Sequence, residues 1–261
     1  MMSESIKNAI ILMYHGVVGK QNIVPPDREI GADLYDVALD NFRAQMTYLK
    51  QSGYRVMTHR TPALDDGHSS AAVLTFDDGE MNNFTDAFPV LKEHEFPAYF
   101  FVIAKRVGKP GYMGLEELRA LHSQGMIIGS HGLSHEILTD LLETQIREEL
   151  SASKKFLEVN LGVEIDSLSI PRGFCNDQVL KLAYEAGYRT IFISERPDDL
   201  DAECCSRVAV KKNWSLKRFE QALRYETPAG EWLVDSIKNG VKKILGGGFY
   251  DWLRSNLLKF K

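Results

Sequence analysis

The sequence predicts an α/β fold, in the form of a distorted (β/α) barrel of seven or eight strands that resembles a TIM barrel. Two observations predict it. Short apolar runs alternate with segments of helical spacing, and three of those segments end in a glycine that leads directly into the next run. Such alternation is typical of a parallel sheet with helices outside. Eight candidate strands in 261 residues favour a barrel over an open sheet, although periodicity alone does not separate the two.

The candidate strands are apolar runs rich in branched or aromatic residues, as expected of strands buried on both faces. They span residues 9–13, 54–58, 72–76, 98–103, 126–130, 168–170, 188–194 and 207–210. Gly53, Gly125 and Gly187 each stand between a helical segment and one of these runs. Glycine suits this place because the residue that closes a helix is often left-handed.

The first helix is predicted from the spacing of Phe42, Met46 and Leu49, which follow i, i+4, i+7. Asp40 or Asn41 would be its N-cap. Two further helices are predicted over residues 140–160 and 176–186.

Two connections stand out between these elements. Residues 22–38 form a long connection with a double proline, and insertions of this kind often border active sites. Residues 65–70, "DDGHSS", are typical of a turn.

The composition is that of an ordinary globular protein, with 44% hydrophobic and 26% charged residues. The net charge of −5 gives no reason to expect nucleic-acid binding. Cys175, Cys204 and Cys205 do not make a disulfide framework, which favours a reducing compartment. The first apolar run is too short for a signal peptide and no run approaches a membrane span, so a cytoplasmic location is expected.

The C-terminal part differs in composition from the rest. Residues 1–230 are predicted to form the barrel and residues 231–261 a basic helical extension packed on it. Residues 238–261 hold six basic residues, one acidic residue and several aromatic ones. A helix of this composition could instead make peripheral contact with a membrane. Nothing in the sequence indicates the oligomeric state.

Polar residues with catalytic chemistry stand at the ends of several candidate strands. In parallel α/β folds such ends lie on one side of the sheet, so these side chains are expected to converge. They are His15, Asp77, Asp78, His131, His135 and Arg172.

The two histidines and the aspartate pair together predict a metal site. His131 and His135 are four residues apart, so on a helical turn they would share a face. Two imidazoles and one carboxylate form a common site for a divalent catalytic metal. For Asp77 and Asp78 to enter one site the chain must turn, which Gly79 makes easy. The alternatives are surface or capping histidines and an N-cap pair of aspartates.

The motifs "TFDDG", "SHGLSH" and "SIPRGFCND…AGYRTIF" resemble those of the polysaccharide deacetylase family, the NodB-homology domain of carbohydrate esterase family 4. The resemblance covers roughly residues 9–210. It implies a NodB-type barrel and metal-dependent hydrolysis of N-acetyl groups on amino sugars. It further implies that Asp77 is the catalytic base and that Asp78, His131 and His135 bind the metal. That metal is usually zinc, with cobalt, nickel or manganese as alternatives.

The chain departs from the family pattern in its second and closing motifs. Gly132 stands where the family normally has Ser or Thr, and the closing Leu-x-His motif is absent because no histidine follows His135. Some members carry the equivalent histidine after the first strand, and "LMYHGV" resembles that permuted order. His15 is therefore the candidate acid, with a structural histidine at a strand end as an equal alternative.

The third motif usually supplies an arginine that orients the base, which gives Arg172 a supporting catalytic role. "PRG" also resembles a variant with an aromatic residue there, and a surface arginine is the alternative. Asp198, Asp199 or Asp201 could be the partner of the acid.

The first function hypothesis is a metal-dependent N-deacetylase that acts on an N-acetylated glycan or glycan precursor. The alternatives are hydrolysis of a small non-sugar amide or cyclic imide, and a glycan-binding barrel without turnover. The expected cytoplasmic location favours a biosynthetic precursor, free or membrane-attached, as the substrate.

Overall fold

The computed structural model describes residue 6 and residues 9–20, 24–62, 70–194 and 204–226. Its strands are β1 (Ile10–Tyr14), β2 (Val17–Val18), β3 (Val37–Ala38), β4 (Arg55–Val56), β5 (Ala71–Phe76), β6 (Tyr99–Val102), β7 (Ile127–Ser130), β8 (Ser167–Ser169), β9 (Thr190–Ile193), β10 (Cys205–Ser206) and β11 (Val208–Ala209). Its longer helices are α2 (Leu39–Gln51), α3 (Phe88–His94), α4 (Leu115–Ser123), α5 (Glu143–Leu161), α6 (Asp177–Glu185) and α7 (Leu216–Leu223). A π-helical stretch, η2 (Asn83–Ala87), leads into α3, and short 3₁₀ turns are η1 (Ala32–Tyr35), η3 (Ala104–Arg106), η4 (Leu138–Asp140) and η5 (Pro171–Gly173).

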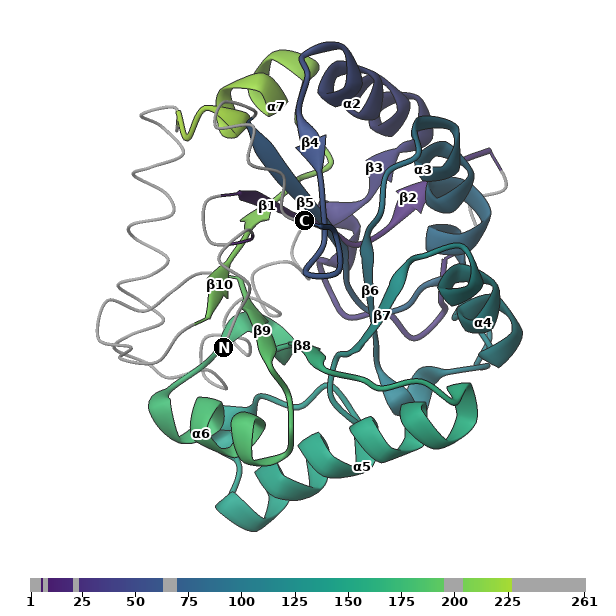
Figure 1. Ribbon diagram of the computed structural model, residues 1–261. Helices are drawn as coiled ribbons and strands as arrows, with labels where there is room; N and C mark the ends of the chain where they lie inside the picture. The colour runs from purple at the N-terminus through teal and green to yellow at the C-terminus, as the bar shows by residue number, and fades with distance from the viewer. Residues whose placement is uncertain (1–5, 7–8, 21–23, 63–69, 195–203, 227–261) are drawn as a thin grey trace.

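The main sheet is parallel and nearly closes into a barrel, with helices around it (Figure 1). Its strand order is β10-β9-β8-β7-β6-β5-β1-β11, and β4 pairs with the start of β5. β10 and β11 are two halves of one segment on either side of Arg207. β10 pairs with β9, and β11 pairs with β1, so this single segment bridges the two edges of the sheet. The distorted barrel predicted from the sequence is thus confirmed.

Side chains alternate between two apolar regions, as the period of two along a strand requires. The barrel interior holds a cluster that includes Ile11, Val73, Tyr99, Phe101 and Phe192. The neighbouring residues on the same strands point outward and pack under the helices in a larger cluster. Polar residues replace apolar ones toward the carboxyl ends of the strands, where Thr75, Asp77, Ser169 and Arg207 are also buried.

Most of the predicted elements are present, with shifts of a few residues at their ends. Gly53, Gly125 and Gly187 have φ of 72°, 84° and 90°, so the predicted left-handed positions are confirmed. The predicted N-cap of α2 is wrong. Ala38 occupies that position, and Asp40 lies in the first turn, because the helix starts directly from β3.

The short parallel pair β2–β3 was not expected. It joins the two ends of the long connection, with Val17 opposite Val37 and Val18 opposite Ala38. The connection therefore leaves the barrel after β1 and returns beside its own starting point. This closure holds residues 24–36 close to the end of β1.

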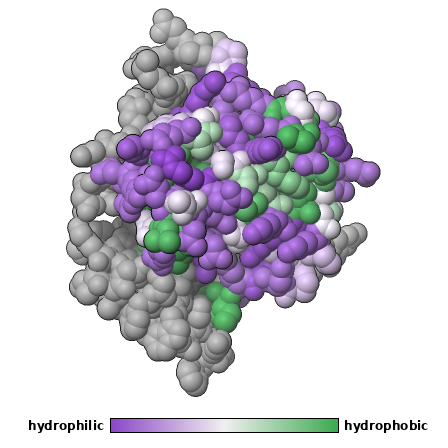
Figure 2. Space-filling model, turned by 90° about the horizontal axis from the view of Figure 1, so that it is seen from below, coloured by the Kyte–Doolittle hydropathy of each residue, from purple (hydrophilic) through white to green (hydrophobic). Residues whose placement is uncertain are grey.

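The face covered by α5 and α6 is mostly hydrophilic, with apolar residues in separate patches (Figure 2). α5 buries Ile146, Leu150 and Leu157 against the sheet and leaves Val159 73% exposed. None of the described helices is both long and apolar enough to cross a lipid bilayer. Some of the predicted features lie outside the described residues: positions 65–69 of the expected turn, the extension at 231–261, and Asp198, Asp199 and Asp201.

Candidate metal centre and active site

The aspartate pair lies where β5 leaves the barrel. Asp77 continues the strand, since its N–H donates to the carbonyl of Tyr14 at 3.0 Å. Asp78 and Gly79 then have φ of 73° and 74°. The turn predicted between the two carboxylates is therefore made by Asp78 itself as well as by glycine. A Cβ at position 79 would lie 2.7 Å from the Val102 side chain, so the second position accepts only glycine without a shift.

The two histidines follow β7 in a non-helical turn, so the helical face expected for them is wrong. Gly132 and His135 have φ of 77° and 70°, and these left-handed positions fold the chain back on itself. The rings come to a centroid distance of 4.8 Å. Glu149 of α5 supports the turn, because its Oε2 accepts hydrogen bonds from the N–H groups of Leu133 and Ser134, both at 3.0 Å.

Hydrogen bonds at the far side of each ring fix the tautomers of both histidines. Nδ1 of His131 donates to the carbonyl of Ser169 at 2.8 Å, and Nδ1 of His135 lies 2.6 Å from Glu29 Oε1. A carbonyl and a carboxylate only accept, so both Nδ1 atoms carry the hydrogen. Burial also lowers the pKa of His131 to about 4, which keeps that ring neutral.

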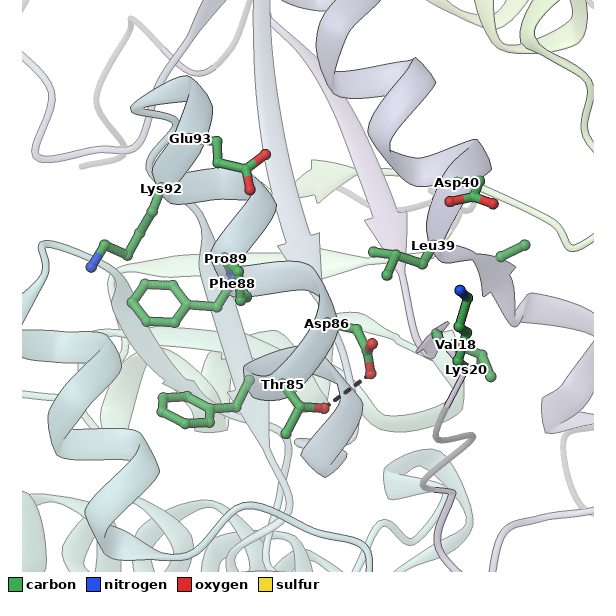
Figure 3. A pocket seen from close by; sticks show the side chains of 13 residues that line it. Val18, Lys20, Leu39, Asp40, Thr85, Asp86, Phe88, Pro89, Lys92 and Glu93 are labelled. Atoms are coloured by element: carbon green, nitrogen blue, oxygen red, sulfur yellow. Dashed lines mark hydrogen bonds between the residues drawn. The ribbon is translucent and has the colours of Figure 1, made fainter.

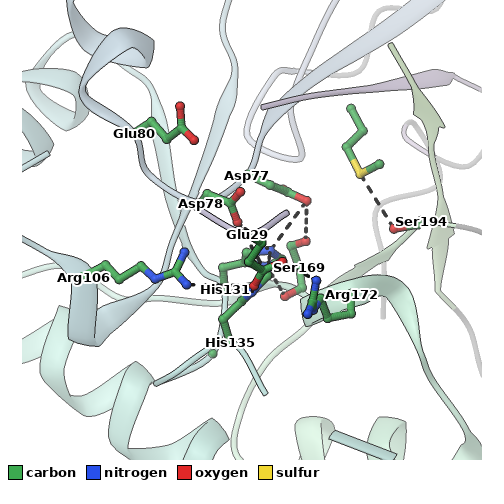
Figure 4. Close-up of polar contacts among 12 residues, drawn as sticks. Glu29, Asp77, Asp78, Glu80, Arg106, His131, His135, Ser169, Arg172 and Ser194 are labelled. Atoms are coloured by element: carbon green, nitrogen blue, oxygen red, sulfur yellow. Dashed lines mark hydrogen bonds and ion pairs between the residues drawn. The ribbon is translucent and has the colours of Figure 1, made fainter. Parts of the chain in front are cut away.

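Three lone-pair atoms consequently face one another. Nε2 of His131 and Nε2 of His135 are 3.2 Å apart, and Asp78 Oδ1 lies 3.6 and 3.5 Å from them (Figure 4). Asp78 Oδ1 is buried and accepts no hydrogen bond from the residues that the structure describes. Ligands bound at about 2.0–2.1 Å in a tetrahedral arrangement lie about 3.3 Å apart. The donor set and its spacing therefore fit one divalent cation such as zinc.

Asp77 lies beside this cluster and is held by Arg207. The two guanidinium Nη atoms of Arg207 donate to the two carboxylate oxygens at 2.8 Å each, and both side chains are buried. Arg207 also donates to Ser169 Oγ at 2.8 Å. Burial by itself would raise the pKa of Asp77, but the charge of Arg207, with smaller contributions from His131 and His15, holds it well below its usual range. Asp77 is thus an ionised carboxylate with Oδ2 3.9 Å from His131 Nε2.

The arginine that orients Asp77 was predicted at position 172 and lies at position 207. Arg172 follows β8, and its Nη1 pairs with Glu29 Oε2. Arg207 was placed at the start of a candidate strand and given no role. A signal was present, since a buried arginine inside an apolar strand requires a carboxylate partner.

The connection 24–36 forms one wall of the site, as its length and prolines suggested. Arg28 makes a bidentate pair with Asp36 and contacts Glu80 Oε1 at 2.7 Å. The next residue, Glu29, contacts both His135 and Arg172 (Figure 4). Burial would raise the pKa of Glu29, but the His135 hydrogen bond and the nearby arginines lower it to about 2. Glu29 was not among the predicted site residues.

His15 follows β1, and its ring lies against that of Tyr35 in the connection 24–36, with a centroid distance of 4.9 Å and an angle of 33° between the ring planes. Its Nδ1 is buried and has no hydrogen-bond partner among the described residues. His15 is close enough to Asp77 to lower the pKa of that carboxyl. The structure therefore brings His15 to the same end of the barrel as the other candidates.

A hollow of about 1150 Å³ lies apart from this cluster, between β2–β3 and α3 (Figure 3). Phe84, Phe88, Leu39 and Lys92 are among its lining residues. It contains none of the predicted site residues, so its size does not make it the reaction centre.

Comparisons with known proteins agree with this geometry. Residues 65–191 match the family model for polysaccharide deacetylase. The chain is 32% identical over 184 residues to YxkH of Bacillus subtilis, a proposed polysaccharide deacetylase, covering 69% of this chain and 62% of that protein. It is 30% identical over 129 residues to the peptidoglycan-N-acetylglucosamine deacetylase of Bacillus cereus, covering 49% and 58%. The matched part thus spans less than two thirds of either relative.

Among solved structures, the Streptococcus pyogenes deacetylase PplD in complex with acetate superposes with a TM-score of 0.68 and 23% identity. The superposition covers 82% of this chain and 97% of that one. At this identity the likeness establishes the fold. The family match over residues 65–191 and the sequence relatives show that this chain resembles the polysaccharide deacetylase family.

Proposed function

We propose that this chain is a metal-dependent N-deacetylase that removes acetyl groups from the amino sugars of a glycan or glycan precursor. The observation that carries the proposal is the convergence of three lone-pair atoms, from Asp78, His131 and His135, beside the ionised carboxylate of Asp77. The Bacillus cereus relative, named for N-acetylglucosamine in peptidoglycan, supports an N-acetylated sugar as the substrate class. Imidazole and carboxylate ligands favour zinc, with cobalt, nickel or manganese as alternatives.

In this proposal Asp78, His131 and His135 hold the ion. When bound, such an ion polarises the acetamide carbonyl and makes a water more acidic. Asp77 accepts the proton of the attacking water. Because Arg207 lowers the pKa of Asp77, this carboxylate is a weak base. It can therefore deprotonate the attacking water only if the acidity of that water is increased.

His15 completes the proposed set as the general acid. Hydrolysis of an amide leaves an amine, which needs a proton as the C–N bond breaks. A positioned acid typically contributes about 10²- to 10⁴-fold to such a step. Two observations support this role: His15 is close enough to Asp77 to lower the pKa of that carboxyl, and its ring contacts that of Tyr35. His15→Ala is therefore expected to lower kcat within that range while leaving metal binding unchanged.

The test is acetate release from N-acetylglucosamine oligomers and from N-acetylated small amides. Metal-stripped protein is assayed with and without added zinc or cobalt, beside Asp77→Asn. Asp33→Asn is the matched control, because the Asp33 side chain is 64% exposed and, among the described residues, makes only a long ion pair with Lys212, at 3.8 Å. Metal-dependent release from the sugars, lost in Asp77→Asn and kept in Asp33→Asn, is the expected result.

Other outcomes would replace the proposal. Release from the small amides alone would assign a non-sugar amidase. Stoichiometric metal binding without release from any substrate would assign a binding barrel.

A further inference from the structure

We propose that Glu29 is a positioning residue for the metal centre, which holds His135 so that its Nε2 faces the ion, and that Arg172 holds Glu29 in turn. The inference rests on the proposed function, because it assumes that Asp78, His131 and His135 bind a cation. It assigns roles to a residue outside the three motifs and to the arginine of the third motif.

The first step of the argument is the contact of Glu29 with His135. Glu29 Oε1 lies 2.6 Å from Nδ1 of His135, a distance typical of a strong charge-assisted hydrogen bond. In the neutral tautomer this bond places the hydrogen on Nδ1 and the lone pair on Nε2, and it fixes the ring orientation. Carboxylate partners of metal-binding histidines generally set the tautomer and the ring orientation in this way.

The second step is that both oxygens of Glu29 are engaged. Oε2 pairs with Nη1 of Arg172, and Arg106 Nη2 lies 3.9 Å from Oε1. Without these cations the carboxylate could rotate toward solvent, because the Glu29 side chain is 29% exposed. Arg172 has φ of 61°, an uncommon backbone conformation for a non-glycine residue. From this turn, the Arg172 side chain extends toward Glu29.

The third step is the difference between the two histidines. His131 donates Nδ1–H to the carbonyl of Ser169, which belongs to β8 and is fixed by the barrel. His135 has no such backbone partner in the described contacts and depends on a side chain from residues 24–36. His135 is also the less buried member of the pair. The ring orientation of His135 therefore depends on the carboxylate of Glu29.

The connection that carries Glu29 is itself anchored beside the site. Arg28 pairs with Asp36 and with the buried Glu80, which follows the aspartate pair by two residues. A Cβ at Gly111 would lie 2.5 Å from Pro25 Cα, so the connection packs closely on the loop after η3. These contacts place Glu29 against His135 before any ion binds.

The experiment compares zinc and cobalt affinity by competition with a chelator in the full chain and in variants. Glu29→Ala is expected to weaken binding by about 10- to 100-fold, the range typical of outer partners of metal ligands. Glu29→Gln keeps an acceptor and should recover part of the affinity. Arg172→Ala should weaken binding less than Glu29→Ala and add little to it in the double variant. The cobalt absorption spectrum should shift in Glu29→Ala and not in Asp33→Asn.

Two results would overturn the inference, and they are distinguishable. Wild-type affinity and an unchanged cobalt spectrum in Glu29→Ala would remove the role of Glu29 and leave the proposed function standing. Absence of stoichiometric binding to the wild-type chain would remove both. If Glu29→Ala does not fold, metal affinity and the cobalt spectrum are measured in Glu29→Gln and Arg172→Ala instead. Wild-type values in both variants would then overturn the inference.

Discussion

The ion pair between Arg207 and Asp77 predicts a large loss of stability when the arginine alone is removed. Both side chains are buried, and two N–H···O bonds of 2.8 Å join them. Arg207→Met keeps most of the apolar stem and leaves a buried carboxylate without its cation. Breaking a buried pair in this way costs about 3–5 kcal/mol, which is a large part of the 5–15 kcal/mol typical of folded domains.

The sign of the pH dependence follows from the pKa shifts. In the wild type the folded pKa of Asp77 is lowered, so its contribution is present above the ordinary aspartate pKa of about 4 and is lost as the pH falls. In Arg207→Met, burial is left without the opposing charge and raises that pKa. The penalty should therefore be greatest near pH 7–8 and shrink toward pH 4, where the carboxyl becomes neutral.

The assay is urea unfolding of the metal-free protein at several pH values. Arg43→Met is the control, because Arg43 is 43% exposed and its loss should change the free energy of unfolding by no more than about 0.5 kcal/mol. The double variant Asp77→Asn/Arg207→Met should be less destabilised than Arg207→Met alone. A loss below about 1 kcal/mol at pH 7, or an equal loss with and without Asp77, would refute the reasoning.

Three further predictions test other parts of the molecule. Gly132→Ser restores the residue type of the family motif but should destabilise the protein by about 1–3 kcal/mol in thermal unfolding. The reason is that Gly132 has φ of 77° and that a Cβ there would lie 3.0 Å from the Pro171 side chain. A neutral effect on stability would contradict this prediction. Added zinc at 100 times its Kd should stabilise the metal-free protein by about 2.7 kcal/mol, and an equal shift in His131→Ala would argue against this site. Burial would raise the pKa of Asp166, but His59 lowers it to about 2, so the free energy of unfolding should fall by about 1–2 kcal/mol between pH 4 and 2. Asp166→Asn should flatten this part of the stability–pH profile, and an unchanged profile would refute the prediction.

The strands of the barrel could be predicted because each is an apolar run, and several of these runs follow a helix-ending glycine or end in a polar motif. Asp78, His131 and His135 could be grouped because strand ends in a parallel sheet share one edge. The actual turn at His131 and His135 could not be predicted. It depends on left-handed backbone at Gly132 and His135 and on Glu149 from a distant helix, which no local pattern indicates.

Arg207 and Glu29 were missed for a different reason. Each acts through a partner more than a hundred residues away in sequence, so its role appears only when the barrel brings the strands together. Arg172 shows the converse error. Its motif predicted the correct side chain at the correct end of the barrel, but the chain places Arg207 against Asp77 and leaves Arg172 to Glu29.

The segment that bridges β9 and β1 also has a consequence for synthesis of the chain. Arg207 lies between its two halves, so the guanidinium reaches Asp77 only when β11 has paired with β1. A nascent chain that ends before residue 205 contains the residues of all three motifs but lacks the guanidinium that holds the Asp77 carboxylate. Completion of the barrel and fixation of the Asp77 carboxylate are thus one event in the formation of the described fold.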